Sequence, residues 1–153
     1  MQPITFECSQ LIPYSALEIC AAIADVTLWS EFKGYGPLPG IARAEYVRRT
    51  DDMVGSQVRV HNTDGSEHVE EITVWEPGRR VTMKLHGFTP PLRRLATHFT
   101  EEWGFTVQDD GTLVTRKFQM FATQPLARPF LWLISLLFRQ AVRQHLSDMA
   151  RAS

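Results

Sequence analysis

The stretch ATHFTEEWGFTVQDDGTLVTRKFQMFA, residues 96–122, decides the fold. Two alternating runs flank Asp109-Asp110-Gly111, which predicts a turn because Asp bonds its own backbone and Gly supplies positive φ. With residues 108–111 as the loop, the runs pair as antiparallel strands. The pairs that share one face are Val107 with Thr112, Phe105 with Val114, Trp103 with Arg116, Glu101 with Phe118, and Phe99 with Met120.

That shared face is mostly apolar, so it is predicted to be concave and buried, yet it carries Glu101 and Arg116. The two charges lie diagonally across the hairpin, within reach of each other. Because an unpaired buried charge is costly, we expect them to pair. The pair is either a structural ion pair or a polar anchor for a ligand carbonyl or carboxylate.

Working outward, the same alternation and turn chemistry predict strands and helices along the whole chain. Strands are expected at 3–11, 41–49, 56–62, 66–75 and 79–86, in addition to 96–107 and 112–122. Ser15 with Glu18 forms a capping box before a short helix, and Asp25 or Thr27 caps a further helical turn. The order predicts an α+β fold: a curved antiparallel sheet of about seven strands grips a long C-terminal helix, with two short helices between strands 1 and 2.

Two turns give conflicting registers in the middle of this sheet. Pro77-Gly78 pairs Val74 with Val81, Ile72 with Met83 and Glu70 with Leu85, which places Glu70 inward. A two-residue turn at Asp64-Gly65 pairs Val60 with Val69 and His61 with His68, which places Glu71 inward instead. Either a bulge lies near residues 69–71 or one register is wrong, and we prefer Glu70 as the inward acid.

The C-terminal segment has helical periodicity for about twenty residues from Phe130. One side is predicted to be buried, with Ser135, Arg139 and Arg143 opposite; its residues are Phe130, Ile134, Leu137, Phe138, Ala141, His145 and Met149. His145 is either a core histidine or a hydrogen-bonding group or base at the cavity end. Trp132 and Leu136 fall away from the core, so the first two turns are apolar all round and need a cover. Within the domain the cover is the loop at 87–95 or a crossing of the helix deep inside the grip of the sheet; outside it, the cover is a homodimer contact or a membrane surface.

Composition bounds the class of protein. The 153 residues are 44% hydrophobic and 22% charged, which is typical of one globular domain spanning 1–153. A formal charge of −1 argues against nucleic acid as a partner, and no apolar run is long enough for an integral membrane segment. Two cysteines and no visible leader indicate a cytoplasmic location. Nucleotide-binding, zincin and serine-hydrolase motifs are missing, and His61 with His68 has no third ligand, so neither a cofactor nor a metal is expected.

Several residues together resemble the START-like (SRPBCC) superfamily, the helix-grip fold of polyketide cyclases, allergens and lipid-transfer proteins. They are Trp29-x-x-Phe32 followed by Gly36-Pro-Leu-Pro-Gly-Ile41, Gly55, Asp64-Gly65, Glu71-Ile72, Glu76-Pro77 before Arg80, and Gly111-Thr112. The chain looks like the bacterial polyketide cyclase/dehydrase-like group over its whole length. The resemblance implies a ligand cavity between the sheet and the C-terminal helix.

The leading hypothesis is a protein that binds a small hydrophobic ligand, such as a lipid, an aromatic or a polyketide-like molecule. The alternatives are a cyclase, dehydratase or hydrolase using Glu101, Glu70, Arg116 and His145, and a protein-interaction module. We expect the loops at 34–40 and 87–95, with Tyr35, Leu38, Phe88 and Leu92, to flank the mouth. The residues expected to line the cavity are Trp29, Phe32, Tyr35, Glu70, Met83, Phe88, Phe99, Glu101, Trp103, Arg116, Phe118, Phe130, Ile134, Phe138 and His145.

Overall fold

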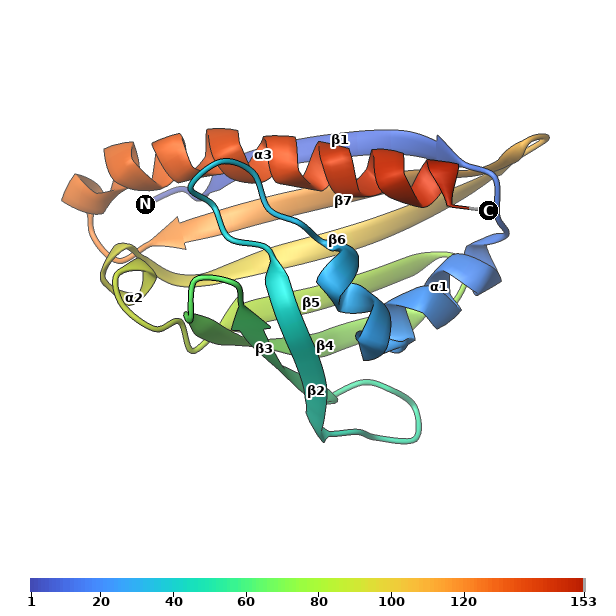
Figure 1. Ribbon diagram of the computed structural model, residues 1–153, viewed down its shortest axis with the longest axis horizontal. Helices are drawn as coiled ribbons and strands as arrows, with labels where there is room; N and C mark the ends of the chain where they lie inside the picture. Colours follow the sequence, from blue (N-terminus) through green and yellow to red (C-terminus); the bar gives the residue numbers. More distant parts are fainter. Residues whose placement is uncertain (153) are drawn as a thin grey trace.

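A seven-stranded antiparallel sheet runs through the whole protein, as predicted. The computed structural model describes residues 1–152. Its strands are β1 (Ile4–Ile12), β2 (Ile41–Arg48), β3 (Gln57–Asn62), β4 (Glu67–Glu76), β5 (Arg80–His86), β6 (Ala96–Gln108) and β7 (Gly111–Ala122). They lie side by side in the order β1-β7-β6-β5-β4-β3-β2, so the first strand pairs with the last (Figure 1). The strand that begins the chain therefore lies beside β7, the strand that leads into the C-terminal helix.

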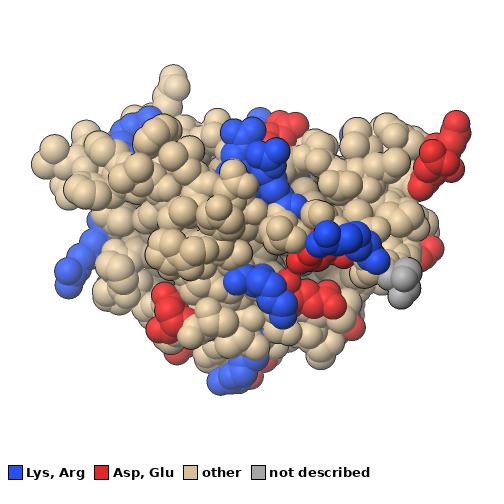
Figure 2. Space-filling model, turned by 45° about the horizontal axis from the view of Figure 1, so that its top comes forward, with Lys and Arg blue, Asp and Glu red and all other residues tan. Residues whose placement is uncertain are grey.

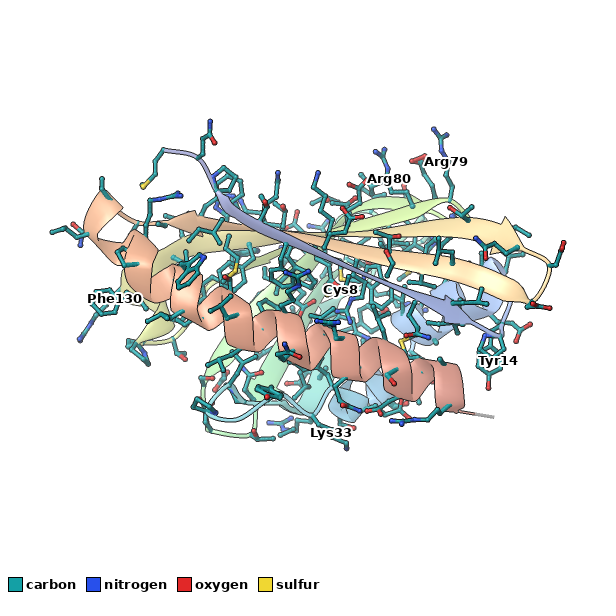
Figure 3. All side chains as sticks on the ribbon, turned by 90° about the horizontal axis from the view of Figure 1, so that it is seen from above. Cys8, Tyr14, Lys33, Arg79, Arg80 and Phe130 are labelled. Carbon is teal, nitrogen blue, oxygen red and sulfur yellow. The ribbon has the colours of Figure 1, made fainter. Side chains whose placement is uncertain are left out.

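The helices occupy one side of the sheet. The helix α3 (Arg128–Arg151) follows the 3-10 turn η2 (Pro125–Ala127) and packs chiefly against β1 and β7 (Figures 1 and 3). Between β1 and β2 lie α1 (Ala16–Ala24) and the 3-10 helix η1 (Val26–Glu31), the two predicted short helices. A single turn, α2 (Leu92–Leu95), falls in the loop that was predicted to lack structure. The helix-grip architecture is therefore confirmed.

The caps that begin the short helices are those read from the sequence. The Ser15 hydroxyl accepts the Glu18 N–H at 3.1 Å, which is the Ser15 half of the predicted capping box, and it donates to the Glu18 carboxylate at 3.1 Å. At η1 the cap is Asp25, whose Oδ1 accepts the N–H of Thr27 at 3.1 Å. These caps fix where the chain leaves β1 and turns over the cavity.

The predicted register of the β6–β7 hairpin is confirmed, with Trp103 opposite Arg116 and Glu101 opposite Phe118. The next two turns differ from their predictions. At Asp64-Gly65, Asn62 N–H bonds Ser66 C=O, so the loop has three residues and Val60 pairs with His68 instead of Val69. His61 consequently faces Glu67 and not His68. Because side chains alternate along a strand, this one-residue shift removes the conflict and turns Glu70 inward.

The Pro77-Gly78 turn was also read only partly correctly. Ile72 pairs with Met83 and Glu70 with Leu85, as predicted. Val74, however, pairs with Thr82 instead of Val81, because the register shifts between Ile72 and Val74. Of the two alternatives, the wrong register at Asp64-Gly65 explains the conflict, and the bulge of β4 lies just beyond residues 69–71.

The buried stripe of α3 is rotated relative to the prediction. Its buried residues are Leu131, Ser135, Phe138, Ala141, Val142 and Leu146. Phe130 was expected to face inward but is 61% exposed. Ser135 was expected to face outward but is buried. Its hydroxyl can leave water because it donates a hydrogen bond to the Trp132 C=O at 2.5 Å. Phe138 and Ala141 were placed correctly, and His145 is half-buried.

The first half of α3 leaves an uncovered apolar surface, here called the α3 apolar face. It comprises Leu126, Phe130, Trp132, Leu133 and Leu136, each at least 45% exposed. Figure 2 shows that few charged side chains interrupt the surface on the left, where α3 begins. Neither the loop at 87–95 nor the sheet therefore covers this face, which contradicts both covers expected within the domain. No helix in residues 1–152 has both the length and the apolar character needed to cross a membrane.

The core fills the space between the sheet and α3 at that same end. Phe118 and Phe6 stack with ring centroids 4.8 Å apart, and Phe138 from α3 packs on Phe118 at 4.6 Å. Cys8 and Cys20 are both free and buried, on a strand and a helix as predicted. Aromatic packing thus closes one end of the groove and leaves the other end open for a cavity.

Candidate functional site

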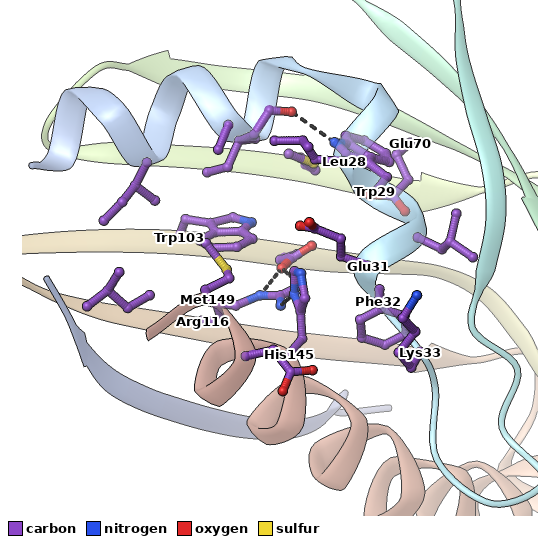
Figure 4. A pocket seen from close by; sticks show the side chains of 18 of the residues that line it. Leu28, Trp29, Glu31, Phe32, Lys33, Glu70, Trp103, Arg116, His145 and Met149 are labelled. Carbon is purple, nitrogen blue, oxygen red and sulfur yellow. Dashed lines mark hydrogen bonds and ion pairs between the residues drawn. The ribbon is translucent and has the colours of Figure 1, made fainter. Parts of the chain in front are cut away.

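A cavity of about 570 Å³ lies between the concave side of the sheet, α1, η1 and the last turns of α3. That volume is within the range of small-molecule sites. The apolar part of its wall includes Ile12, Ile19, Ile23, Trp29, Phe32, Met83, Leu85, Trp103, Phe118, Phe138 and Met149. The Trp29 indole donates to the Ile23 C=O at 2.9 Å, which holds the ring against the cavity (Figure 4).

The polar inner wall is built on the β6–β7 hairpin. Arg116 contacts Glu101 Oε2 through Nε at 2.6 Å and through Nη2 at 2.5 Å. Its third contact joins Nη1 to His145 Nδ1 at 2.9 Å, so α3 and the sheet meet at this guanidinium (Figure 4). The guanidinium carbon also lies 4.2 Å from the centre of the Trp103 ring, a cation–π geometry. The predicted pairing of Glu101 with Arg116 is confirmed.

Burial changes the proton affinity of both groups that flank Arg116. Burial raises the pKa of Glu101 to about 7; the charge of Arg116 opposes this rise and the charge of Glu70 adds to it. Burial, with the charge of Arg116, lowers the pKa of His145 to about 3. His145 is therefore a neutral imidazole at pH 7, and its Nδ1 accepts the hydrogen bond from Arg116.

Glu70 supplies a second buried carboxylate from β4. It is 7% exposed, and its Oε2 lies 2.9 Å from His68 Nε2. Glu71, the other candidate, is instead bonded to Gln57 at 3.1 Å and does not line the cavity. His68 was not predicted at this site because the two-residue turn had placed it opposite His61. A three-residue loop at Asp64-Gly65 would have paired it with Val60. Because side chains two apart on a strand share a face, the preferred inward position of Glu70 already implied that His68 lies beside it.

Ten of the fifteen predicted residues line the cavity. They are Trp29, Phe32, Glu70, Met83, Glu101, Trp103, Arg116, Phe118, Phe138 and His145. The other five do not line it. Phe88 and Phe99 are buried and pack together with ring centroids 4.8 Å apart, and Ile134 packs against the core. Tyr35 lies on a separate polar surface groove beside Arg143, and Phe130 belongs to the α3 apolar face.

The mouth is not where it was expected. Neither the loop at 34–40 nor the loop at 87–95 lines the cavity. The exposed lining residues come from the other end of α3 and from the segment around η1; they are Glu18, Leu28, Glu31, Lys33 and Ala152. The hydroxyl of Tyr14 donates to the Ala152 C=O beside this opening. Sequence reasoning missed these residues because they lie on or just after the short helices or near a chain end, with no motif of their own.

Among the residues that the structure describes, the side chains of the site are not grouped as metal ligands. Within residues 1–152, no group of three or more His, Cys, Asp or Glu side chains is arranged to hold a metal ion. Arg116 instead bonds to Glu101 and His145, and Glu70 bonds to His68. The arrangement suits recognition of an organic molecule through apolar contact and a few hydrogen bonds.

With this geometry in view, comparison with known proteins identifies the family. Residues 3–153 match the family described as polyketide cyclase/dehydrase and lipid transport. The chain belongs to this family. The polyketide cyclase/dehydrase family membership confirms the resemblance read from the sequence. A comparison with curated protein sequences finds no match.

Solved structures share the fold of this polyketide cyclase/dehydrase family member at low sequence identity. The ZhuI aromatase/cyclase from Streptomyces sp. R1128 superposes with a TM-score of 0.72 at 15% identity, covering 97% of this chain and 94% of that one. A START superfamily protein from Mycobacterium smegmatis gives 0.71 at 12% identity, with 98% and 97% covered. The di-domain aromatase/cyclase BexL, from the BE-7585A biosynthetic pathway, gives 0.68 at 19% identity. The alignment includes 99% of this chain but only 51% of BexL, so the chain spans about half the length of that protein.

Proposed function

We propose that this protein binds a small hydrophobic ligand in the cavity between the sheet and α3. The observation that carries the proposal is a mostly apolar cavity of about 570 Å³ with a few polar groups at its inner wall. The family, whose description includes lipid transport and polyketide cyclisation, supports the same class of ligand. The two free, buried thiols, Cys8 and Cys20, support the expectation of a reducing, cytoplasmic setting.

The experiment is titration with a neutral fluorescent probe, N-phenyl-1-naphthylamine. Saturable binding with one site per chain is expected. Ala22 lines the cavity from α1, whereas its neighbour Ala21 is exposed and does not. Ala22→Phe fills space inside the cavity, so it should weaken probe binding by about tenfold, the effect of losing contact area worth roughly 1.4 kcal/mol. Ala21→Phe, the matched control, should leave binding unchanged.

Two results would count against this function. One is a wild-type protein that shows no saturable binding. The other is an Ala22→Phe variant that is folded by circular dichroism and binds the probe as well as Ala21→Phe does, which would place the probe elsewhere on the surface.

A second candidate function is proton-transfer catalysis on such a ligand, and the raised pKa of Glu101 favours it. A carboxylate with a pKa of about 7 is matched to abstracting a proton near neutral pH. The step would move a proton from the carbon next to a ligand ketone to the Glu101 carboxylate. Because Glu101 is then neutral, the charge of Arg116 is available to stabilise the resulting enolate oxygen. Glu101 then exchanges this proton with solvent and returns a solvent-derived one to the carbon, which regenerates both the ketone and the carboxylate.

This step is measurable as hydrogen–deuterium exchange. We expect the protein to accelerate deuterium uptake next to the carbonyl of 2-tetralone in D2O, followed by NMR, and Glu101→Gln to abolish the acceleration. Exchange no faster than in buffer of equal pH would leave the protein as a binder only.

A further inference from the structure

The ionisable side chains that line the cavity are unbalanced in sign. Five are carboxylic acids and two are permanent cations: Glu18, Glu31, Glu70, Glu101 and Asp148 against Lys33 and Arg116. The whole chain has a formal charge of only −1, so this imbalance belongs to the cavity and not to the protein in general. A cavity lined by one sign of charge repels a ligand of the same sign.

The cation of the inner wall, Arg116, is already paired. Arg116 is 6% exposed and already contacts Glu101 at 2.5 and 2.6 Å. Its remaining contact is to His145, a neutral acceptor at pH 7. A ligand carboxylate brought to Arg116 would compete with Glu101 for the guanidinium and would lie near Glu70 as well. Like charges in a desolvated site are costly, so the inner wall disfavours such a ligand.

The mouth does not compensate for this. Lys33 donates to the backbone C=O of Ser30 at 3.1 Å, and the exposed carboxylates of Glu18 and Glu31 border the same opening. Asp148 is paired with Arg151 at 2.6 Å, so these two charges offset each other. An anionic ligand therefore meets no net attraction on its way in.

The inner wall does offer hydrogen bonds to a neutral polar group. Trp103 lines the cavity, and its Nε1 is buried without an acceptor among residues 1–152. Both short contacts from Arg116 to Glu101 go to the same oxygen, Oε2, which leaves Oε1 able to accept from another donor. A buried N–H without a partner is unusual in proteins. A hydroxyl group both accepts and donates, so one hydroxyl on a ligand could satisfy both atoms.

We propose that the cavity selects uncharged aromatic molecules that carry a phenolic or enolic hydroxyl, and discriminates against the carboxylate of the same skeleton. Aromatic rings on the wall, from Trp29, Phe32 and Trp103, favour an aromatic skeleton. This proposal rests on the proposed binding function and specifies its ligand class.

The test compares 2-naphthol with 2-naphthoate at pH 8 as competitors of bound N-phenyl-1-naphthylamine. At this pH a phenol, with a pKa near 10, is neutral, whereas a carboxylic acid, with a pKa near 4, is ionised. The two probes share one ring system, so their difference reports the polar group. We expect 2-naphthol to displace the reporter with an inhibition constant at least about tenfold lower than that of 2-naphthoate.

Variants then locate the source of the discrimination. Glu101→Gln frees the charge of Arg116 and makes the acceptor for the ligand hydroxyl neutral. The affinity for 2-naphthoate should therefore rise by about tenfold or more, while that for 2-naphthol should not rise. Glu70→Gln removes the other inner carboxylate and keeps a side chain that can bond to His68, so it serves if Glu101→Gln does not fold. Glu7→Gln, at an exposed position of β1 that does not line the cavity, is the matched control and should change neither affinity.

The outcomes separate this proposal from the binding function itself. Displacement by 2-naphthol but only weakly by 2-naphthoate supports both. Equal or tighter binding of 2-naphthoate to the wild type overturns the charge discrimination and leaves the binding function standing. A wild type that binds the reporter but retains it against both naphthalene probes overturns the ligand class. A wild type that does not bind the reporter at all overturns the binding function and this proposal with it.

Discussion

Replacing Arg116 with Met is the most direct test of the inner wall. Arg116 and Glu101 are 6% and 3% exposed, and their contacts of 2.5 and 2.6 Å involve a single carboxylate oxygen. Methionine preserves the apolar stem of the arginine and removes its charge. The variant leaves Glu101 buried without its counter-ion and His145 Nδ1 without its donor.

The loss in free energy of unfolding can be estimated from these contacts. Breaking a buried ion pair by removing one partner costs roughly 3–5 kcal/mol, and this range includes the penalty of the unpaired carboxylate. The cation–π contact with Trp103 at 4.2 Å adds about 1 kcal/mol. We therefore expect Arg116→Met to lower the free energy of unfolding by about 4 kcal/mol at pH 7.

The loss should also depend on pH in a defined direction. The folded-state pKa of Glu101 is raised from an ordinary 4.5 to about 7, so the folded protein holds the proton more tightly and loses stability as pH rises across that interval. In the wild type the free energy of unfolding stops falling with pH near pH 7, where Glu101 loses its proton in the folded state. Without Arg116 the pKa of Glu101 rises further, so the variant should keep losing up to about 1.4 kcal/mol per pH unit above pH 7.

The assay is urea unfolding followed by circular dichroism at pH 7 and pH 8. Glu101→Gln/Arg116→Met should recover much of the loss and remove its increase above pH 7. Arg59→Met is the matched control, because Arg59 forms an exposed cross-strand pair with Glu67 at 3.7 Å and should cost less than about 1 kcal/mol. A cost for Arg116→Met as small as that of Arg59→Met would show that Arg116 is solvated and would refute the account of the inner wall.

Three further predictions concern other parts of the structure. Burial lowers the folded-state pKa of His145 from an ordinary 6.5 to about 3. The unfolded chain therefore binds more protons in that interval, and the free energy of unfolding falls as the pH drops through it. In urea unfolding between pH 6.5 and 5, His145→Gln should lose about 2 kcal/mol less than the wild type. Trp132→Ser, on the α3 apolar face, should shift a homodimer toward monomer in sedimentation velocity, and a wild type that stays monomeric at high micromolar concentration would exclude this dimer. Gly111 has φ of +142°, and an added Cβ would lie 2.2 Å from the Ile12 C=O, so Gly111→Ala should cost more than about 2 kcal/mol in thermal and urea unfolding, whereas Gly104→Ala, with no atom within 4 Å, should cost less than about 1 kcal/mol.

The parts of this structure that the sequence predicted are those fixed by local chemistry. The β6–β7 register follows from one turn, and once it is fixed the alternation of side chains places Glu101 beside Arg116. The same logic was wrong at Asp64-Gly65, where the dipeptide does not reveal whether the loop has two residues or three. One extra residue was enough to change the cross-strand partner of His68 from His61 to Val60, and with it the face on which His68 and Glu70 both lie.

The buried face of α3 was harder to predict for a different reason. Its first two turns are apolar on every side, so the periodicity does not define which side faces the sheet. Ser135 looked like a surface residue but is buried with its hydroxyl bonded to the preceding turn. The position of the mouth depends on how α1 and η1 pack over the sheet, and packing between distant segments leaves no local signal in the chain.

The contact between the Tyr14 hydroxyl and the Ala152 C=O has a practical consequence for handling the protein. Ala152 lines the cavity, so any affinity tag, fluorescent label or immobilisation linker attached after it would begin at the ligand entrance. The amino terminus lies at the opposite end of the molecule (Figure 1). Surface-immobilised binding measurements should therefore tether the chain through its amino-terminal end, and a carboxy-terminal tag should be removed before ligand affinities are compared.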